Sequence, residues 1–281
     1  MDKIKIRNLE VYAYHGVYPE EKREGQNFIV SAELSVPTRK AGLSDALDDS
    51  VNYGEVCHFI DEYMRSKSFN LLEAVTENLA KELLINFEKI EQVKLEVKKP
   101  EAPIGLPFGY VSVEISRKWH KAYLGLGSNM GDKRDYILGA LNLLRKEHNC
   151  IVEKVSGLFE TKPYGNIEQD DFLNGCVLIS TLYAPEELLD VLNEIENQAG
   201  RKRVEADKWG PRTLDIDILF YDDIIYSSEK LQIPHCDLHN RMFVLEPLKE
   251  IAPHYRHPLR RETVNQMFSN LSGELLQKRS T

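Results

Sequence analysis

Alternating apolar and polar positions along residues 1–117 predict four strands and two helices. In residues 28–36 the apolar side chains fall on every second position, which is typical of a strand with one buried face. Between residues 53 and 87 the apolar positions instead recur at helical spacing. The predicted strands span 4–11, 28–36, 93–97 and 110–115, and the predicted helices span 53–65 and 71–87. This ββααββ order predicts a mostly antiparallel sheet with its helices on one face.

The pattern of the remaining residues predicts a second compact domain of the α/β type, joined to the first with almost no linker. Only residues 117–121 separate the last strand of the first segment from the next strand. The predicted strands span 122–126, 152–159, 173–182 and 213–221, and the predicted helices span 133–146 and 185–198. Pro185 suits the first position of its helix. The C-terminal third is predicted to be irregular, with one short helix at 244–250.

The overall composition is that of an ordinary globular protein and excludes disordered, collagen-like and coiled-coil classes. The 281 residues include 36 Lys and Arg against 45 Asp and Glu, which gives a formal net charge of −9. This acidic balance, spread over both segments, argues against a nucleic acid partner. Because the chain shows neither a long apolar run nor a signal peptide, we expect a cytoplasmic protein without a membrane partner.

The four cysteines lie far apart in the sequence and form no C-x-x-C pair. Such spacing signals neither a structural zinc site nor a dithiol redox pair. We therefore expect free, buried thiols at Cys57, Cys150, Cys176 and Cys236.

A glycine-rich turn, Gly125-Leu-Gly-Ser-Asn-Met-Gly131, follows a predicted strand and precedes a predicted helix. This context is typical of a dinucleotide-binding fingerprint, so an NAD-dependent oxidoreductase is one hypothesis. The third glycine comes one residue late for that fingerprint, however, and no series of parallel βαβ units surrounds it. A tight turn that needs glycine for its backbone conformation is the alternative interpretation.

Two carboxylates, Asp215 and Asp217, stand two positions apart in a predicted strand. Because side chains alternate between the faces of a strand, they should lie side by side on one face. The apolar residues around them should point into a core: Leu214, Ile216, Ile218 and Phe220. Paired carboxylates repel each other unless a cation compensates, and Mg²⁺ is bound through one or two carboxylates together with substrate phosphates. A solvated polar strand face is the other interpretation of the pair alone.

Several arginines stand near the carboxylate pair in the sequence: Arg201, Arg203, Arg212 and Arg241. Guanidinium groups match phosphate oxygens, and a metal ion with several arginines is the recurring arrangement for phosphoryl transfer. A basic loop beside an acidic metal pair indicates a triphosphate substrate, whereas a solvated charged turn is the alternative for residues 201–203.

Four stretches of the second segment together resemble the 6-hydroxymethyl-7,8-dihydropterin pyrophosphokinase family. They are 125–129 (GLGSN), 172–174 (FLN), 196–217 with its WGPRTLDID motif, and 234–243. The resemblance implies a ferredoxin-like α/β sandwich over residues 119–281. It also implies transfer of the β,γ-pyrophosphoryl group of ATP to the hydroxymethyl group of the pterin, with AMP as the second product and two Mg²⁺ ions bound with ATP.

The functional residues of that family carry over by position. The metal ligands would be Asp215 and Asp217, which form the catalytic set together with Arg201 and Arg212. The groups facing ATP would be Glu196, Arg201, Arg203, Trp209, Arg212, His235 and Arg241. The groups binding the pterin would be the rings of Phe172 and Phe243 with Thr161, Tyr164 and Asn174. Phe172 departs from the usual Tyr of the family, which keeps the stacking ring but loses a hydroxyl.

The first segment resembles dihydroneopterin aldolase. The residues that carry the resemblance are 14–16 (YHG), Glu21, 25–26 (GQ), 53–56 (YGEV), 70–73 (NLLE) and 98–99 (KK). The resemblance implies an α+β tunnelling fold over residues 1–118, assembled into tetramers or octamers with sites between subunits. It also implies retro-aldol cleavage of 7,8-dihydroneopterin into 6-hydroxymethyl-7,8-dihydropterin and glycolaldehyde, without a metal or other cofactor.

In this resemblance Lys99, Tyr53 and Glu21 would be catalytic, and Glu73, Leu72 and Asn52 would bind the substrate. Glu73 has a second interpretation, because it lies three residues after Asn70 and could complete a capping box at the start of a helix. Asn52 stands where some relatives have His, which excludes a proton-transfer role for its side chain.

The two resemblances concern consecutive reactions, since the product of the aldolase is the pterin substrate of the pyrophosphokinase. We therefore expect a bifunctional enzyme of folate biosynthesis that binds dihydroneopterin, hydroxymethyl-dihydropterin, ATP and further copies of itself. Besides the oxidoreductase hypothesis, a non-catalytic pterin-binding scaffold is an alternative.

Overall fold

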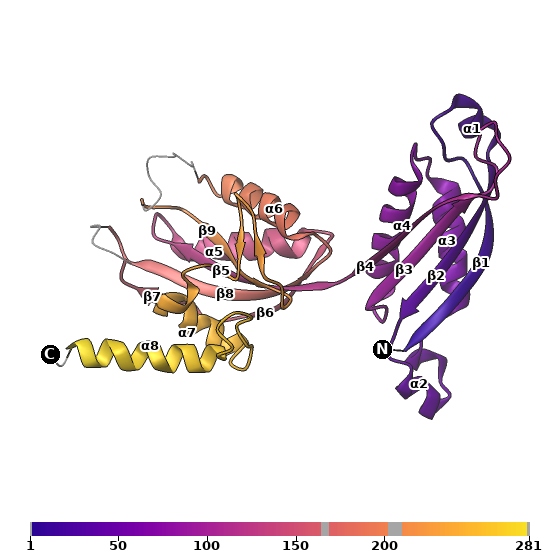
Figure 1. The fold of residues 1–281 in the computed structure, drawn as a ribbon. Helices are drawn as coiled ribbons and strands as arrows, with labels where there is room; N and C mark the ends of the chain where they lie inside the picture. Colours follow the sequence, from indigo (N-terminus) through magenta and orange to yellow (C-terminus); the bar gives the residue numbers. More distant parts are fainter. Residues whose placement is uncertain (1, 164–168, 202–209, 280–281) are drawn as a thin grey trace. The chain divides into compact units, whose positions relative to one another are not determined.

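The structure, a computed structural model, describes residues 2–163, 169–201 and 210–279. The chain divides into two compact units, Met1–Trp119 and His120–Thr281, each with its own sheet and helices (Figure 1). No helix in the described ranges combines the length and the apolar character that crossing a membrane requires.

The first unit is a four-stranded antiparallel sheet with two long helices packed on it (Figure 1). Its strands follow one another in space in the order β1, β2, β3, β4. The strands are β1 (Lys3–Ala13), β2 (Gln26–Ser35), β3 (Gln92–Lys99) and β4 (Val111–Lys118), and the helices are α3 (Tyr53–Ser66) and α4 (Leu72–Asn86). The predicted ββααββ order and antiparallel sheet are confirmed. Short helices α1 (Pro19–Glu24) and α2 (Arg39–Ser44) and the 3₁₀ turn η1 (Leu47–Asp49) occupy segments where none was predicted.

The core of the first unit forms where the sheet meets α3 and α4. Its fully buried members include Phe28, Val30, Leu34, Leu95 and Val97 on the strands and Val56, Ile60, Val75, Leu79 and Leu83 on the helices. Each side chain of this kind contributes about 1.5–3 kcal/mol on burial. Packing of their apolar faces, more than intrinsic helix propensity, therefore stabilises α3 and α4.

The starts of these two helices differ. Asn52 caps α3, because its Oδ1 accepts a hydrogen bond from Gly54 N at 3.0 Å. Helix α4 has Leu71 at its N-cap, which offers no capping side chain, and the Asn70 side chain instead accepts a hydrogen bond from Lys22 Nζ. The alternative interpretation of Glu73, as part of a capping box with Asn70, is therefore wrong.

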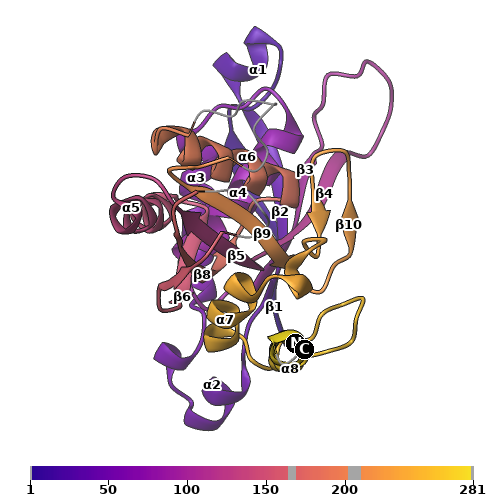
Figure 2. The ribbon, with the colours of Figure 1, turned by 90° about the vertical axis from the view of Figure 1, so that its left-hand side faces the viewer.

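The second unit is a five-stranded antiparallel sheet with helices on both faces (Figures 1 and 2). Strand β5 lies between β8 and β9, while β6 and β7 both pair with β8. Helices α5 and α6 cover one face and α7 and α8 the other. The strands are β5 (His120–Ser128), β6 (Cys150–Val155), β7 (Phe159–Thr161), β8 (Phe172–Thr181) and β9 (Asp215–Tyr221). The helices are α5 (Lys133–Lys146), α6 (Pro185–Gln198), α7 (Met242–Ile251) and α8 (Val264–Arg279). The smaller elements are β10 (Tyr226–Ser227), β11 (Gln232–Ile233) and the 3₁₀ turn η2 (Leu238–Asn240).

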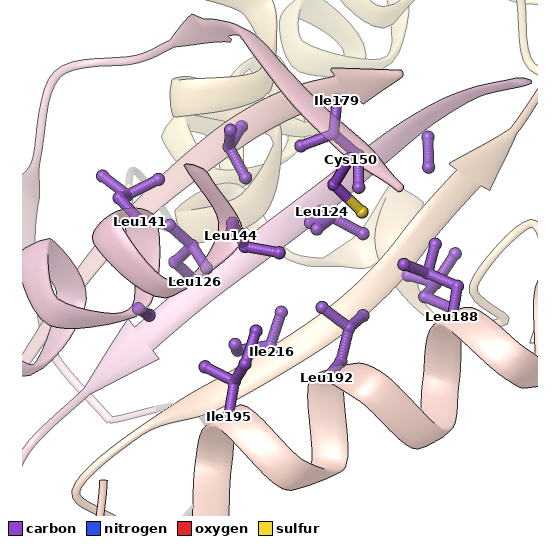
Figure 3. Close-up of a cluster of buried hydrophobic side chains, with 14 of the residues drawn as sticks. Leu124, Leu126, Leu141, Leu144, Cys150, Ile179, Leu188, Leu192, Ile195 and Ile216 are labelled. Carbon is purple, nitrogen blue, oxygen red and sulfur yellow. The ribbon is translucent and has the colours of Figure 1, made fainter. Parts of the chain in front are cut away.

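The larger core of the second unit lies between the sheet and helices α5 and α6 (Figure 3). Side chains from β5, β8 and β9 and from both helices meet there, including Leu124, Leu126, Leu141, Leu144, Ile179, Leu188, Leu192 and Ile216. A second cluster fills the opposite face under α7 and α8. Because both faces of β5, β8 and β9 are covered, the polar ends of these strands are held in fixed positions.

Strand β9 contains an irregularity that simple alternation does not reveal. Ile218 pairs with Leu124 and Phe220 with Tyr123, which leaves Leu219 as an extra residue. Such a bulge shifts the following side chains to the opposite face of the sheet. Phe220 accordingly joins the cluster under α7 and α8, so its predicted place in the same core as the other three apolar residues is wrong.

The C-terminal third is more helical than predicted, because α8 was not expected there. The start of α8 carries reciprocal hydrogen bonds: Gln266 N donates to Thr263 Oγ1 at 3.2 Å, and Thr263 N donates to Gln266 Oε1 at 2.8 Å. This is the capping box that a Thr-x-x-Gln sequence favours. The sequence therefore contained the signal for this helix.

The single strand predicted at 152–159 is divided into β6 and β7. At the break, Ser156 Oγ accepts a hydrogen bond from Cys176 N at 2.8 Å and donates one to Gly157 O at 2.7 Å. The side chain thus takes over a bond that the strand ladder would otherwise make.

All four cysteines are free. Cys150 and Cys176 are buried as expected, and Cys57 is half-buried. Cys236 is exposed, so the expectation of a buried thiol is wrong there.

Candidate active sites

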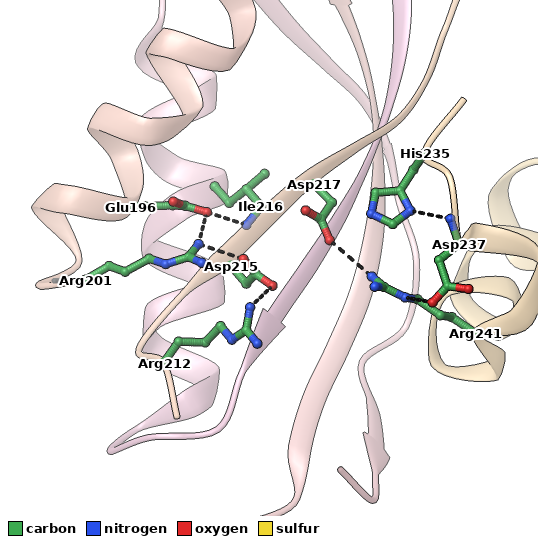
Figure 4. Close-up of polar contacts among 9 residues, drawn as sticks. All are labelled: Glu196, Arg201, Arg212, Asp215, Ile216, Asp217, His235, Asp237 and Arg241. Atoms are coloured by element: carbon green, nitrogen blue, oxygen red, sulfur yellow. Dashed lines mark hydrogen bonds and ion pairs between the residues drawn. The ribbon is translucent and has the colours of Figure 1, made fainter. Parts of the chain in front are cut away.

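The two carboxylates of β9 lie on one face of the strand, as the alternation predicts, while Ile216 between them enters the core (Figure 4). Asp215 is held from two sides: Arg201 Nη1 donates to Oδ1 at 2.6 Å and Arg212 Nη1 donates to Oδ2 at 2.7 Å. Asp217 Oδ2 lies 3.8 Å from Arg241 Nη1. Three of the predicted phosphate-facing arginines are thus gathered around the carboxylate pair.

The two carboxylates differ in their electrostatic surroundings. Desolvation and the neighbouring Asp215 carboxylate raise the pKa of Asp217 to about 7. Burial lowers the pKa of Arg201, but the Asp215 and Glu196 carboxylates outweigh this effect and raise the pKa above its usual value. Arg201 therefore stays positively charged. Burial and the neighbouring carboxylate therefore disfavour the charge on Asp217, and a cation bound beside it would favour the ionised form.

Glu196, at the end of α6, is 1% exposed and joins α6 to β9. Its Oε1 accepts hydrogen bonds from Ile216 N at 2.8 Å and from Arg201 Nη1. The residue fixes both the strand that carries the carboxylates and the arginine that faces them.

His235 and Arg241 approach the carboxylate pair from the segment before α7 (Figure 4). Arg241 Nε donates to Asp237 Oδ2 at 3.0 Å, and Asp237 N donates to His235 Nδ1 at 3.2 Å. Burial and the charge of Arg241 lower the pKa of His235 to about 4. The imidazole is therefore neutral near pH 7 and acts as a hydrogen-bonding group.

The donor set fits Mg²⁺ better than a transition metal. Within the described ranges, no group of three or more His, Cys, Asp or Glu side chains is arranged to hold a metal. A pair of carboxylates without His or Cys suits a hard cation that keeps waters and takes its other ligands from substrate phosphates.

The predicted pterin-binding residues gather beside this cluster. Asn174 Nδ2 donates to Thr161 Oγ1 at 2.6 Å. The guanidinium carbon of Arg212 lies 5.9 Å from the ring centre of Phe172. On the other side, the guanidinium carbon of Arg241 lies 5.8 Å from the ring centre of Phe243. Each aromatic ring thus stands next to an arginine of the carboxylate cluster.

The glycine-rich turn has a packing role at this place. A Cβ atom on Gly127 would lie 3.0 Å from Asn174 Oδ1 and 4.0 Å from the Phe172 ring. The residue at position 127, near the end of β5, must therefore be small to leave room for both side chains. Because β5 is antiparallel to both of its neighbours, the turn is not part of a parallel dinucleotide-binding sheet, and the basis of the oxidoreductase hypothesis is removed.

Three predicted residues fall outside the described ranges, namely Tyr164, Arg203 and Trp209. Sequence reasoning gave no individual role to Asn129, which is buried beside Arg212. Its place in the GLGSN stretch was the available signal.

In the first unit, Glu21 of α1 and Lys99 at the end of β3 form a close ion pair. Tyr18 N donates to Glu21 Oε2 at 3.0 Å, and Gln26 Nε2 donates to Glu21 Oε1 at 3.2 Å. Although burial favours the neutral acid, the bonds from Lys99, Tyr18 and Gln26 lower the pKa of Glu21. Near pH 7 Glu21 is therefore a carboxylate.

His15 and Gly16, which the resemblance included without a role, support this pair. His15 is 2% exposed, and its Nδ1 accepts a hydrogen bond from Phe69 N at 3.2 Å. Burial, followed by the charge of Lys99, lowers the pKa of His15 to about 4. Gly16 N donates to Phe69 O at 2.9 Å. These bonds tie the end of β1 to the turn between α3 and α4.

That turn leads to Leu72 and Glu73 at the start of α4, so these two residues lie at the same end of the unit as the Glu21–Lys99 pair. Tyr53 and Asn52 lie at the opposite end of α3, whose 14 residues span about 21 Å. Tyr53 is 64% exposed there. One chain thus brings together four of the six predicted aldolase residues and leaves Tyr53 and Asn52 apart.

Two family profiles match the chain: dihydroneopterin aldolase over residues 4–116 and 7,8-dihydro-6-hydroxymethylpterin-pyrophosphokinase over residues 123–253. The folic acid synthesis protein FOL1 of Dictyostelium discoideum is 35% identical over 96% of this chain and 45% of that protein. The 2-amino-4-hydroxy-6-hydroxymethyldihydropteridine pyrophosphokinase of Aquifex aeolicus is 42% identical over 51% of this chain and 88% of that protein. A solved structure, E. coli dihydroneopterin aldolase in complex with neopterin, is 30% identical, covers 42% of this chain and 99% of that chain, and gives a TM-score of 0.39.

The chain spans less than half the length of the folic acid synthesis proteins that match both units. It covers 45% of the Dictyostelium discoideum protein and 37% of the Schizosaccharomyces pombe protein.

Proposed function

Because the chain belongs to the family of folate-synthesis proteins that join a dihydroneopterin aldolase to a hydroxymethylpterin pyrophosphokinase, we propose that it catalyses both reactions in succession. Residues 1–118 would cleave 7,8-dihydroneopterin, and residues 119–281 would pyrophosphorylate the resulting 6-hydroxymethyl-7,8-dihydropterin. The observation that carries this proposal is the gathering of Asp215, Asp217 and three arginines beside the pterin-binding residues.

In the aldolase reaction the Glu21–Lys99 pair supplies the groups for proton transfer. Retro-aldol cleavage needs a base for the side-chain hydroxyl and an acid for the carbanion, which the C=N bond of the pterin stabilises. The close contact of Lys99 with Glu21 fixes the position of the ammonium group. Glu73 is exposed at the same end of the unit, where its carboxylate can accept two hydrogen bonds from the amino edge of the pterin.

We further propose that Tyr53 and Asn52 serve the site of a neighbouring copy. The support is the length of α3, which separates them from Lys99 within one chain. A site completed between subunits requires self-association through the first unit, as tetramers or octamers.

Complementation between inactive chains tests this shared site. Tyr53→Phe and Lys99→Ala chains should each be inactive as aldolases. When the two are unfolded together and refolded as a mixture, some sites receive Lys99 from one chain and Tyr53 from the other. We expect aldolase activity to return to about a quarter of the wild-type value in the mixture, by the statistics of random assembly. A mixture as inactive as its components would contradict a shared site.

In the pyrophosphokinase reaction, Asp215 and Asp217 would hold Mg²⁺, which when bound supplies positive charge against the β- and γ-phosphates of ATP. Arg201, Arg212 and Arg241 would bind phosphate oxygens beside that position. The rings of Phe172 and Phe243 would stack on the flat pterin, and Asn174 would bond its edge. The chain thus orients the pterin hydroxyl toward the polyphosphate.

The decisive experiment supplies dihydroneopterin and Mg·ATP to the purified chain and follows the pyrophosphorylated pterin. AMP should appear as the second product. Release of ADP would contradict pyrophosphoryl transfer, and absence of both conversions would favour the non-catalytic scaffold. Asp217→Asn should abolish only the second reaction and Lys99→Ala only the first. The cytoplasmic location and the absence of a nucleic acid or membrane partner stay predictions.

A further inference from the structure

Asn129, directly after β5, is 2% exposed, and both ends of its side-chain amide are bonded. Its Oδ1 accepts a hydrogen bond from Arg212 N at 2.7 Å, while its backbone N donates to Arg212 O at 3.1 Å. Its Nδ2 donates to Gln169 Oε1 at 3.1 Å and to Asp170 O at 3.4 Å. One side chain therefore connects two segments that are more than 40 residues apart in the sequence.

In the proposed function, one of the two segments contributes to the nucleotide site and the other to the pterin site. Arg212 lies three residues before the start of β9, and its guanidinium donates to Asp215. Gln169 and Asp170 lie three and two residues before β8, which begins with Phe172, a ring proposed to stack on the pterin. Lys133 Nζ provides a second tie on the pterin side, since it donates to Asp171 O at 2.8 Å.

The residue type at position 129 suits this bridge. Asn presents an acceptor and two donors on opposite sides of one rigid amide. Ala would leave the half-buried Arg212 N–H without its partner, and Asp would place a carboxylate oxygen against the Asp170 carbonyl. Leaving a buried group unpaired costs more than the net gain of the bond itself, so the bridge holds both segments firmly.

We propose that Asn129 is a positioning residue that couples the pterin site to the nucleotide site, a role that rests on the proposed pyrophosphokinase function. A ligand bound at either site stabilises the segment beside it in the position where it is hydrogen-bonded to Asn129. Through Asn129, the other segment is stabilised in its hydrogen-bonded position as well. By linkage, each ligand then raises the affinity for the other by the same factor.

The coupling factor is measured by titration calorimetry with hydroxymethyl-dihydropterin, in the absence and presence of a saturating Mg·ATP analogue. The analogue carries a methylene group between the α- and β-phosphorus atoms, because the proposed reaction breaks that bond. In the wild-type chain we expect the analogue to tighten pterin binding at least tenfold. In Asn129→Ala this factor should fall at least fivefold, while the affinity for the analogue alone changes less than twofold.

Gln169→Ala provides a second test should Asn129→Ala fail to fold, because it removes one partner at a half-buried position and leaves the Arg212 bonds intact. It should lower the same factor, and the double variant should show no further loss. The matched control is Asn142→Ala on the exposed side of α5, which should keep the wild-type factor.

An unchanged coupling factor in Asn129→Ala, or in Gln169→Ala if the first variant does not fold, would overturn the proposal. So would equal weakening of both ligands with the factor preserved, which is the mark of a purely structural role. If the wild-type chain binds both ligands without coupling, this inference fails and the proposed function stands. If it binds neither, the proposed function fails as well.

Discussion

Gly16→Ala tests how the Glu21–Lys99 pair is held. A Cβ atom at position 16 would lie 2.3 Å from Cδ and Oε2 of Glu21 and 2.7 Å from its Cβ. The overlap falls on a carboxylate that three groups fix, namely Lys99, Tyr18 N and the Gln26 amide. The carboxylate must therefore move, and its bonds to these groups must lengthen or break.

The size of the effect follows from these contacts. Overpacking of a dense site costs about 1–3 kcal/mol, and a hydrogen bond to a charged group contributes about 1.5–3 kcal/mol. We expect the free energy of unfolding of the first unit to fall by about 2 kcal/mol. Because a positioned acid or base accelerates proton transfer by roughly 10²–10⁴, aldolase activity should fall at least about 100-fold.

The assay measures both activities and hydrogen exchange of β2 in the same purified chain. Pyrophosphorylation should keep its wild-type rate, since the second unit is untouched. Gly42→Ala is the matched control, because nothing lies within 4 Å of a Cβ atom there and α2 should tolerate alanine. Full aldolase activity in Gly16→Ala with unchanged protection of β2 would refute the reasoning.

Two further predictions concern buried charge. Because the folded pKa of His15 is about 4, the unfolded chain takes up its proton near pH 6.5 while the folded chain does not, so stability is lost as the pH falls from about 7 toward 4. The free energy of unfolding of the first unit should fall by about 2 kcal/mol near pH 5. Urea unfolding, followed by hydrogen exchange of the β2 amides, should show this loss in the wild-type chain and in His58→Asn, a control at an exposed position. His15→Asn should not show it. Asp217→Asn removes a carboxylate whose charge is destabilised by burial and by the neighbouring Asp215. Without metal, the second unit of this variant should gain stability on the order of 1 kcal/mol, while pyrophosphokinase activity is lost. A lower melting temperature of the variant would contradict this.

The elements that the sequence predicted well are those whose cause is local. Alternation along β2 and helical spacing in α3 and α4 follow from which face each side chain must bury. The shared face of Asp215 and Asp217 follows from the same two-residue period and needs no knowledge of the surrounding strands. The Thr263–Gln266 capping box shows that one missed helix was also a local matter.

The wrong predictions arise from contacts between distant segments. The Asn70 side chain accepts a hydrogen bond from Lys22, which lies 48 residues earlier, and does not cap the helix. Leu219 becomes a bulge because of its pairing with β5, so the face of Phe220 depends on a neighbouring strand. The hydrogen bond from Asn129 to Gln169, which the sequence did not predict, also joins residues that are 40 positions apart. No pattern within a single element contains this information.

The length of α3 has a consequence for how the two reactions respond to the amount of protein. If Tyr53 must come from another copy, no motion within one chain can complete an aldolase site. Dilution below the dissociation constant of the assembly would then lower the cleavage rate per chain, whereas the carboxylates, arginines and aromatic rings of the second site all belong to one unit. Abundance would thus set the ratio of the two activities, with scarce chains left able to consume the intermediate but not to make it.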